Sequence, residues 1–111
     1  MSTVVKSPAL RDPFLADVRH RLHAIYGDRI KRVVLYGSRA RGDHKRDSDY
    51  DIAVFLREYD GSWDEVKRMA DLGYELMMEE RKDVSVKPFR LIDWRIDTLF
   101  MRHLRRDGIE L

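Results

Sequence analysis

Apolar residues recur along this 111-residue chain with two different periods, and each period predicts one type of element. In the segments 12–26, 62–80 and 91–106 they lie three or four positions apart, the spacing of one face of an α-helix. The segments 33–36, 49–56 and 83–87 are short and alternating or rich in β-branched residues, which is typical of β-strands. The predicted order is αββαβα, an α/β (α+β) arrangement in which helices flank a small sheet.

Capping and breaking residues set the expected ends of these elements. Asp12 and Pro13 suit the cap and the first turn of the first helix. Ser62 and Glu65 have the spacing of a capping box at the start of the second helix. Pro88 cannot donate a ladder hydrogen bond, so we expect it to limit the third strand.

The expected organisation is one domain with a loose start. Residues 1–10 are predicted to form a flexible N-terminal tail, and residues 11–111 a single domain. A short strand is expected at 109–111, after the last helix.

The composition narrows the class of protein. Hydrophobic residues make up 43% and charged residues 38%, which is typical of a globular domain with a dense ionic surface. The absence of cysteine excludes disulfides and thiolate metal sites. No apolar run approaches the ~20 residues of a membrane span and no signal peptide is evident, so the cytoplasm is the expected location. A formal net charge of only +2 does not indicate nucleic acid as a direct partner.

Asp49 and Asp51 stand at the start of the second predicted strand. Residues two apart on a strand project from the same face, so the two carboxylates repel each other unless a cation lies between them. Mg²⁺ prefers carboxylate oxygens together with substrate phosphates and water. The pair indicates a metal site, although two solvated acids would give the same pattern.

Gly37 and Ser38 follow directly after the first predicted strand. A glycine there lets the backbone approach a phosphate, whose oxygens the next N–H groups and the Ser38 hydroxyl can bind. An ordinary turn is the alternative. If the first two strands are antiparallel neighbours, this turn lies beside Asp49 and Asp51, which is the combination that nucleotidyl transfer needs.

Asp83 opens the third predicted strand. The helix at 62–80 could supply the crossover of a parallel strand pair, which would bring Asp83 to the same end of the sheet as Asp49 and Asp51. Three carboxylates could hold two metal ions roughly 3.5–4 Å apart, and Asp83 could also act as the base. The alternative is that Asp83 only follows the preceding helix.

Arg39 and Arg41 follow the glycine turn. Guanidinium groups suit triphosphate oxygens, so both are candidates for phosphate contacts. A solvated basic loop is the alternative.

Gly37-Ser38, ten further residues and then Asp49-x-Asp51 resemble the signature of the DNA polymerase β-like nucleotidyltransferase superfamily. The longer stretch LYGSRARGDHKRDSDYDIAVFL, with Ser48 before the first aspartate, closely resembles its minimal nucleotidyltransferase (MNT) branch. The resemblance implies a polymerase β-like fold with a mixed sheet, two Mg²⁺ ions and ATP as substrate. It also implies that Asp49, Asp51 and Asp83 act as metal ligands and catalytic acids. It places Gly37 and Ser38 at the phosphates, so that the expected nucleotide-binding residues are Gly37, Ser38, Arg39, Arg41 and Ser48.

Stand-alone members of the MNT branch are typically antitoxins whose partner is an all-helical HEPN ribonuclease toxin. The resemblance therefore implies a protein adenylyltransferase that moves AMP from ATP to a tyrosine of such a toxin. Two alternatives stay open: a non-catalytic binding module that masks the toxin, and nucleotidyl transfer to a small molecule or to RNA.

Overall fold

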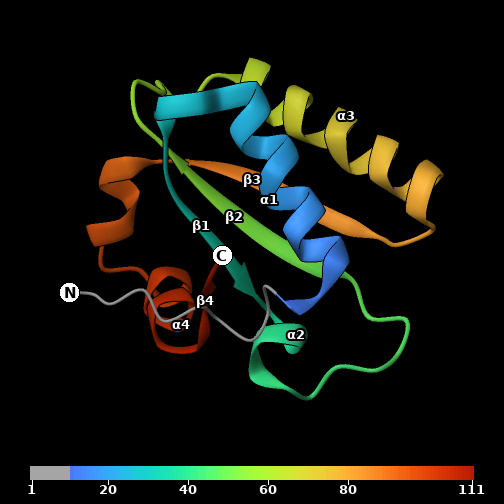
Figure 1. Ribbon diagram of the computed structural model, residues 1–111. Helices are drawn as coiled ribbons and strands as arrows, with labels where there is room; N and C mark the ends of the chain where they lie inside the picture. Colours follow the sequence, from blue (N-terminus) through green and yellow to red (C-terminus); the bar gives the residue numbers. More distant parts are fainter. Residues whose placement is uncertain (1–10) are drawn as a thin grey trace.

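Figure 1 shows the computed structural model, which describes residues 11–111 as helices packed against both faces of one small sheet. The predicted tail, residues 1–10, lies outside the described residues. The helical elements are α1 (Pro13–Tyr26), the 3₁₀ turn η2 (Gly27–Arg29), α2 (Ser38–Arg41), α3 (Trp63–Glu80), the 3₁₀ helix η3 (Leu91–Arg95) and α4 (Leu99–Asp107). The strands are β1 (Ile30–Tyr36), β2 (Tyr50–Leu56), β3 (Val84–Arg90) and β4 (Ile109–Glu110). No helix in this part of the chain is both long and apolar enough to span a membrane.

The strands form one mixed sheet in the order β3-β2-β1-β4. β1 pairs antiparallel with β2, which places Tyr36 opposite Asp51. β2 pairs parallel with β3, with Tyr50 opposite Val84, and α3 forms the crossover between them. These pairings confirm the predicted α+β fold with a mixed sheet. They also bring the end of β1 and the starts of β2 and β3 to the same end of the sheet.

The alternation of β2 separates two cores, one on each face of the sheet. Its even-numbered residues join the buried side chains of α1 and α3 in one cluster. Ala53 and Phe55 join Met101 and Leu104 of α4 in the other cluster. Burial of each large apolar side chain contributes roughly 1.5–3 kcal/mol. Because Asp51 continues the row of Ala53 and Phe55, its carboxylate belongs to the α4 side of the sheet.

The last helix is shorter than the apolar period predicted. One helix was expected over 91–106, whereas the chain forms η3, an extended segment and then α4. Asp93 accepts the Arg90 N–H at 2.9 Å, and the Thr98 hydroxyl accepts the Met101 N–H at 3.1 Å. These side-chain bonds start two separate short helices, because they compete with continuation of one long helix. Ile96 consequently stays exposed instead of joining the core.

β3 runs through Pro88 to Arg90, so the prediction that Pro88 limits this strand was wrong. β3 lies at the edge of the sheet, beside β2. The Tyr50 N–H donates to the Asp83 carbonyl at 2.9 Å. In a parallel pair of strands, alternate residues form hydrogen bonds with the neighbouring strand. Because Asp83 bonds to β2, the odd-numbered residues of β3 face β2 and the N–H groups of its even-numbered residues point away from it. Pro88 therefore occupies a position at which the ladder needs no donor.

The predicted capping box of α3 is also absent. Ser62 occupies the N-cap position, but its side chain makes no cap hydrogen bond. Glu65 is buried and pairs with the Arg29 guanidinium at 3.0 Å instead. A buried carboxylate is stabilised far more by an ion pair than by one backbone N–H, which explains the different partner.

Candidate active site

The turn from β1 into α2 lies at one end of the sheet, beside the start of β2 (Figure 1). Gly37 forms this turn with φ of 77° and ψ of −159°, a conformation that residues with a side chain avoid. A Cβ at this position would lie 3.3 Å from Asp51 Cγ and would collide with Asp51 Oδ2. The missing side chain thus lets the backbone of the turn lie directly against the Asp51 carboxylate, as the antiparallel pairing predicted.

Asp51 carries an unfavourable charge in the position where the fold places it. Its pKa is raised above its ordinary value of 3.8, first by burial and then by the negative charge of Asp49. Lys87 and Arg41 lower it and so offset part of this effect. A divalent cation would remove the repulsion between the two carboxylates, and their oxygens are the ligands that Mg²⁺ prefers. The donor set of this site therefore fits Mg²⁺.

Tyr50 anchors the strand between the two acids. Its ring packs against that of Phe14 with 4.7 Å between centroids, and its hydroxyl donates to Asp12 Oδ2 at 2.9 Å. Asp12 also caps α1, as predicted, by accepting the Phe14 N–H at 2.9 Å. Because Tyr50 is fixed on the α1 side, Asp51 is directed to the opposite face of the sheet.

Asp83 lies at the same end of the sheet, immediately before β3. The Tyr50–Val84 pairing and the parallel direction of the strands put Asp83 level with Asp49. Both residues border a cavity of about 550 Å³ between α3 and β3. Within residues 11–111, however, no three histidine or acidic side chains converge on a common point that could hold a metal ion. Asp83 as a third ligand and the second ion therefore stay predictions.

Arg39 and Ser48 organise the loop that leads to Asp49. Arg39 donates to the carbonyl of Ser48 at 2.9 Å and to that of Arg46 at 3.1 Å. Its guanidinium also stacks 3.9 Å from the centre of the Tyr50 ring. The Ser48 hydroxyl accepts the Lys45 N–H at 2.8 Å. Both side chains act on the loop backbone in this structure, and their contacts with a nucleotide stay predictions.

Arg41 is exposed but lies in the same pocket as the Gly37 turn. It lines a pocket of about 360 Å³ together with Gly37 and, from α4, Phe100 and His103. Its charge lowers the pKa of Asp51, and its guanidinium pairs with Asp43 at 3.2 Å. Ser38 begins α2 directly after Gly37, on the same turn. A triphosphate bound at this turn would meet the charge of Arg41.

Lys87 is the residue that the sequence analysis missed. It lies on β3, and its charge lowers the pKa of Asp51. The alternation of side chains along a strand could have indicated Lys87, because positions 83, 85 and 87 share one face. With the parallel register known, that face is the one on which Asp51 lies.

Comparison with known proteins assigns the family. Residues 23–111 match the family described as "Polymerase beta, Nucleotidyltransferase", and the chain belongs to that family. The matched region contains every residue of the candidate site, from Gly37 to Lys87. Family membership confirms the predicted resemblance to the polymerase β-like nucleotidyltransferases.

One curated sequence relative is a protein of Methanocaldococcus jannaschii named "Putative protein adenylyltransferase MJ0141". It is 34% identical over 44 residues, which make up 40% of this chain and 44% of that protein. The similarity thus spans less than half the length of that relative.

Two solved structures share the fold. A crystal structure of a toxin–antitoxin with AMP-PNP superposes with a TM-score of 0.60 at 20% identity, covering 85% of this chain and 69% of that chain. A mutant of the MntA-HpeT toxin–antitoxin gives a TM-score of 0.59 at 18% identity, with the same coverage of 85% and 69%. At these identities the likeness shows a common fold.

Proposed function

We propose that this chain is a Mg²⁺-dependent nucleotidyltransferase of the cytoplasm that transfers AMP from ATP to a tyrosine hydroxyl of a HEPN-type toxin and so acts as its antitoxin. The observation that carries the proposal is the contact of the Gly37 backbone with the Asp51 carboxylate, beside Asp49. A phosphate-binding turn and a cation-binding pair of acids thereby share one end of the sheet. AMP-PNP in the structurally similar toxin–antitoxin supports a nucleotide substrate and a toxin partner.

The proposed reaction is an in-line displacement at the α-phosphorus of ATP. The acceptor oxygen forms a bond to this phosphorus, the bond to the bridging oxygen breaks, and pyrophosphate leaves. Asp49 and Asp51 would hold Mg²⁺, and the ion would supply positive charge to the triphosphate and would lower the pKa of the acceptor hydroxyl. The Gly37 turn and the Ser38 hydroxyl bind and orient the phosphates. Asp83 receives the hydroxyl proton and is the candidate ligand of a second ion.

Three basic and polar residues have supporting parts in this proposal. Arg41 adds positive charge beside the triphosphate. Arg39 and Ser48 hold the loop that fixes the position of Asp49. Their role is to position the metal ligands, since catalysis by metal ions depends on fixed ligand geometry.

Label transfer tests the proposal directly. The purified chain is mixed with Mg²⁺, ATP labelled at the α-phosphate and the protein encoded by the neighbouring gene. Label should appear on that protein, and Asp49→Asn should reduce the rate by about 100-fold or more, because a metal ligand is lost. Asp47→Asn is the matched control, because Asp47 is an exposed acid of the same loop, two positions before Asp49.

Each alternative function has its own outcome in this experiment. Full transfer by Asp49→Asn would refute the metal role of the acidic pair. A stable complex without any label would indicate a masking module instead of an enzyme. Label on RNA or on a small molecule, with the partner protein unlabelled, would redirect the assignment to that acceptor.

A further inference from the structure

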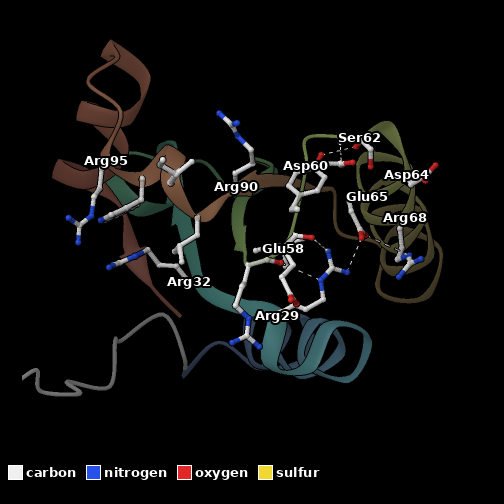
Figure 2. A pocket seen from close by; sticks show the side chains of 16 residues that line it. Arg29, Arg32, Glu58, Asp60, Ser62, Asp64, Glu65, Arg68, Arg90 and Arg95 are labelled. Carbon is white, nitrogen blue, oxygen red and sulfur yellow. Dashed lines mark hydrogen bonds and ion pairs between the residues drawn. The ribbon is translucent and has the colours of Figure 1, made fainter.

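A larger cavity lies at the other end of the sheet, away from Gly37 and Asp51. Its volume is about 1060 Å³. The start of β1, the end of β2, the β2–α3 loop, the first turns of α3 and η3 surround it (Figure 2). β1 and β2 each have seven residues, so they separate this cavity from the candidate active site by roughly 20 Å. The proposed transfer reaction gives the cavity no part.

Arginines form one wall of this cavity. Figure 2 shows Arg32, Arg90 and Arg95 on the same side of it, and Arg57 also lines it. Two of these guanidinium groups are held in place: Arg32 lies 4.0 Å from the centre of the Trp94 ring and pairs with Glu110, and Arg90 pairs with Asp93 at 2.9 Å.

The other two arginines are unengaged. The side chains of Arg57 and Arg95 are exposed and, as far as residues 11–111 are concerned, neither forms an ion pair or a hydrogen bond. This wall therefore carries two guanidinium groups that are held in place and two that are available. Such a wall is suited to an anion with several oxygens, because each guanidinium group can bind two oxygen atoms.

The α3 side of the cavity carries acids together with two arginines that are already paired, because Arg29 and Arg68 contact Glu65 at 3.0 Å and 3.8 Å. Asp60 and Asp64 lie on the α3 side, across the cavity from Arg32 and Arg95 (Figure 2). A carboxylate accepts hydrogen bonds from hydroxyl and amino groups. Ile92 lines the cavity with 64% of its surface exposed, which offers an apolar surface to a flat ring.

We propose that this cavity is a second, non-catalytic site that binds a free nucleotide. The phosphates lie against Arg57 and Arg95, the base lies near Ile92 of η3, and the ribose hydroxyls or the base amino group bond to Asp60 or Asp64. Inorganic phosphate would leave the apolar and acidic parts unused. The volume of about 1060 Å³ lies at the upper limit of small-ligand sites, which is roughly 1,000 Å³.

Trp94 provides a local reporter for the test. The chain has two tryptophans, and Trp63 is 74% exposed, so Trp63→Phe leaves Trp94 as the only tryptophan with little effect on the fold. ADP is titrated in EDTA, in a variant that also carries Asp51→Asn to weaken binding at the active site. We expect a saturable change in Trp94 fluorescence. Adenosine alone and pyrophosphate alone should each bind about tenfold more weakly than ADP.

Substitution of the two unengaged arginines completes the test. Arg57→Ala combined with Arg95→Ala should raise the Kd for ADP by about tenfold or more. Arg19→Ala, at an exposed arginine of α1, is the matched control and should leave it unchanged. Equal ADP binding with and without Arg57 and Arg95 would overturn the proposal, and so would pyrophosphate that binds as tightly as ADP. A 5′-phosphorylated oligoadenylate that binds more tightly than ADP would overturn it in favour of an RNA end.

Discussion

Gly37 combines two demands that no other residue type meets. Its backbone lies in a region closed to side-chain-bearing residues, and its missing Cβ leaves room for the Asp51 carboxylate. Gly37→Ala should lower the free energy of unfolding by about 1–3 kcal/mol from backbone strain alone, and should also displace Asp51. Urea denaturation measures the first effect, and Mg²⁺-ATP binding by calorimetry measures the second.

Gly42 offers a control at the other end of α2, where it is the C-cap. It also has positive φ, at 84°, but a Cβ there would meet nothing within 4 Å. Gly42→Ala should therefore lower stability by about 1 kcal/mol and leave Mg²⁺-ATP binding intact. Equal effects of both substitutions on nucleotide binding would show that contact with Asp51 is not the reason for glycine at position 37.

Single residues of the site differ in how far the sequence predicted them. The proximity of Gly37 and Asp51 was predicted, because it follows from the antiparallel pairing of two consecutive strands. Arg39 was predicted to contact phosphate, but its guanidinium binds two loop carbonyls. Lys87 was missed because its proximity to Asp51 depends on strand register. A contact that depends on the tertiary structure produces no repeating pattern in the sequence.

Among the elements, the start of α3 depends on an ion pair and not on its cap. Glu65 is buried and binds Arg29 at 3.0 Å, and Arg29 also donates to the Glu58 carbonyl at 3.4 Å. Arg29→Ala leaves the buried Glu65 carboxylate with only its longer contact to Arg68, at 3.8 Å, and should lower the free energy of unfolding by about 1–3 kcal/mol. Ser62→Ala should change it by less than about 0.5 kcal/mol, since the Ser62 side chain makes no cap bond.

Urea denaturation of these variants, with a double-mutant cycle on Arg29 and Glu65, measures the difference. A larger loss for Ser62→Ala than for Arg29→Ala would restore the capping box. The sequence predicted where α3 begins, because Ser62 suits the N-cap. It could not predict that an arginine 33 positions before Ser62 would take Glu65 as its partner.

At the scale of the whole molecule, the fold places charge repulsion at one end of the sheet. The raised pKa of Asp51 means that the folded chain holds this proton more tightly than the unfolded chain. The stabilising contribution of Asp51 is complete below its ordinary pKa of 3.8 and is lost as the pH rises through the raised value. Without Mg²⁺, Asp51→Asn should therefore be more stable than the wild type at pH 7, and the difference should shrink toward acidic pH.

Thermal unfolding across a pH series checks this expectation. Asp47→Asn should follow the wild-type curve, because Asp47 is exposed. Addition of Mg²⁺ should stabilise the wild type and leave Asp51→Asn nearly unchanged, since a ligand that binds only the folded state stabilises it. A wild type that is already more stable than Asp51→Asn at pH 7 in EDTA would contradict the electrostatic account.

The overall architecture was predictable because it follows from a few pairings. An antiparallel pair from β1 and β2 and a helical crossover to β3 were both inferred from element order, and both are present. The break at Thr98 was not predictable from the apolar period, because side-chain caps interrupted a helix whose hydrophobic spacing continued. The three-acid arrangement depends on side-chain directions at Asp83, which element order does not define.

Pro88 has a consequence for how this chain behaves among copies of itself. An outermost strand with a complete row of outward N–H groups is a template on which another chain can add, and that growth leads to aggregates. Pro88 removes one donor from the row on β3, beside the charged Lys87. The colloidal stability of the protein at high concentration thus depends on an imino acid that has no part in the proposed chemistry.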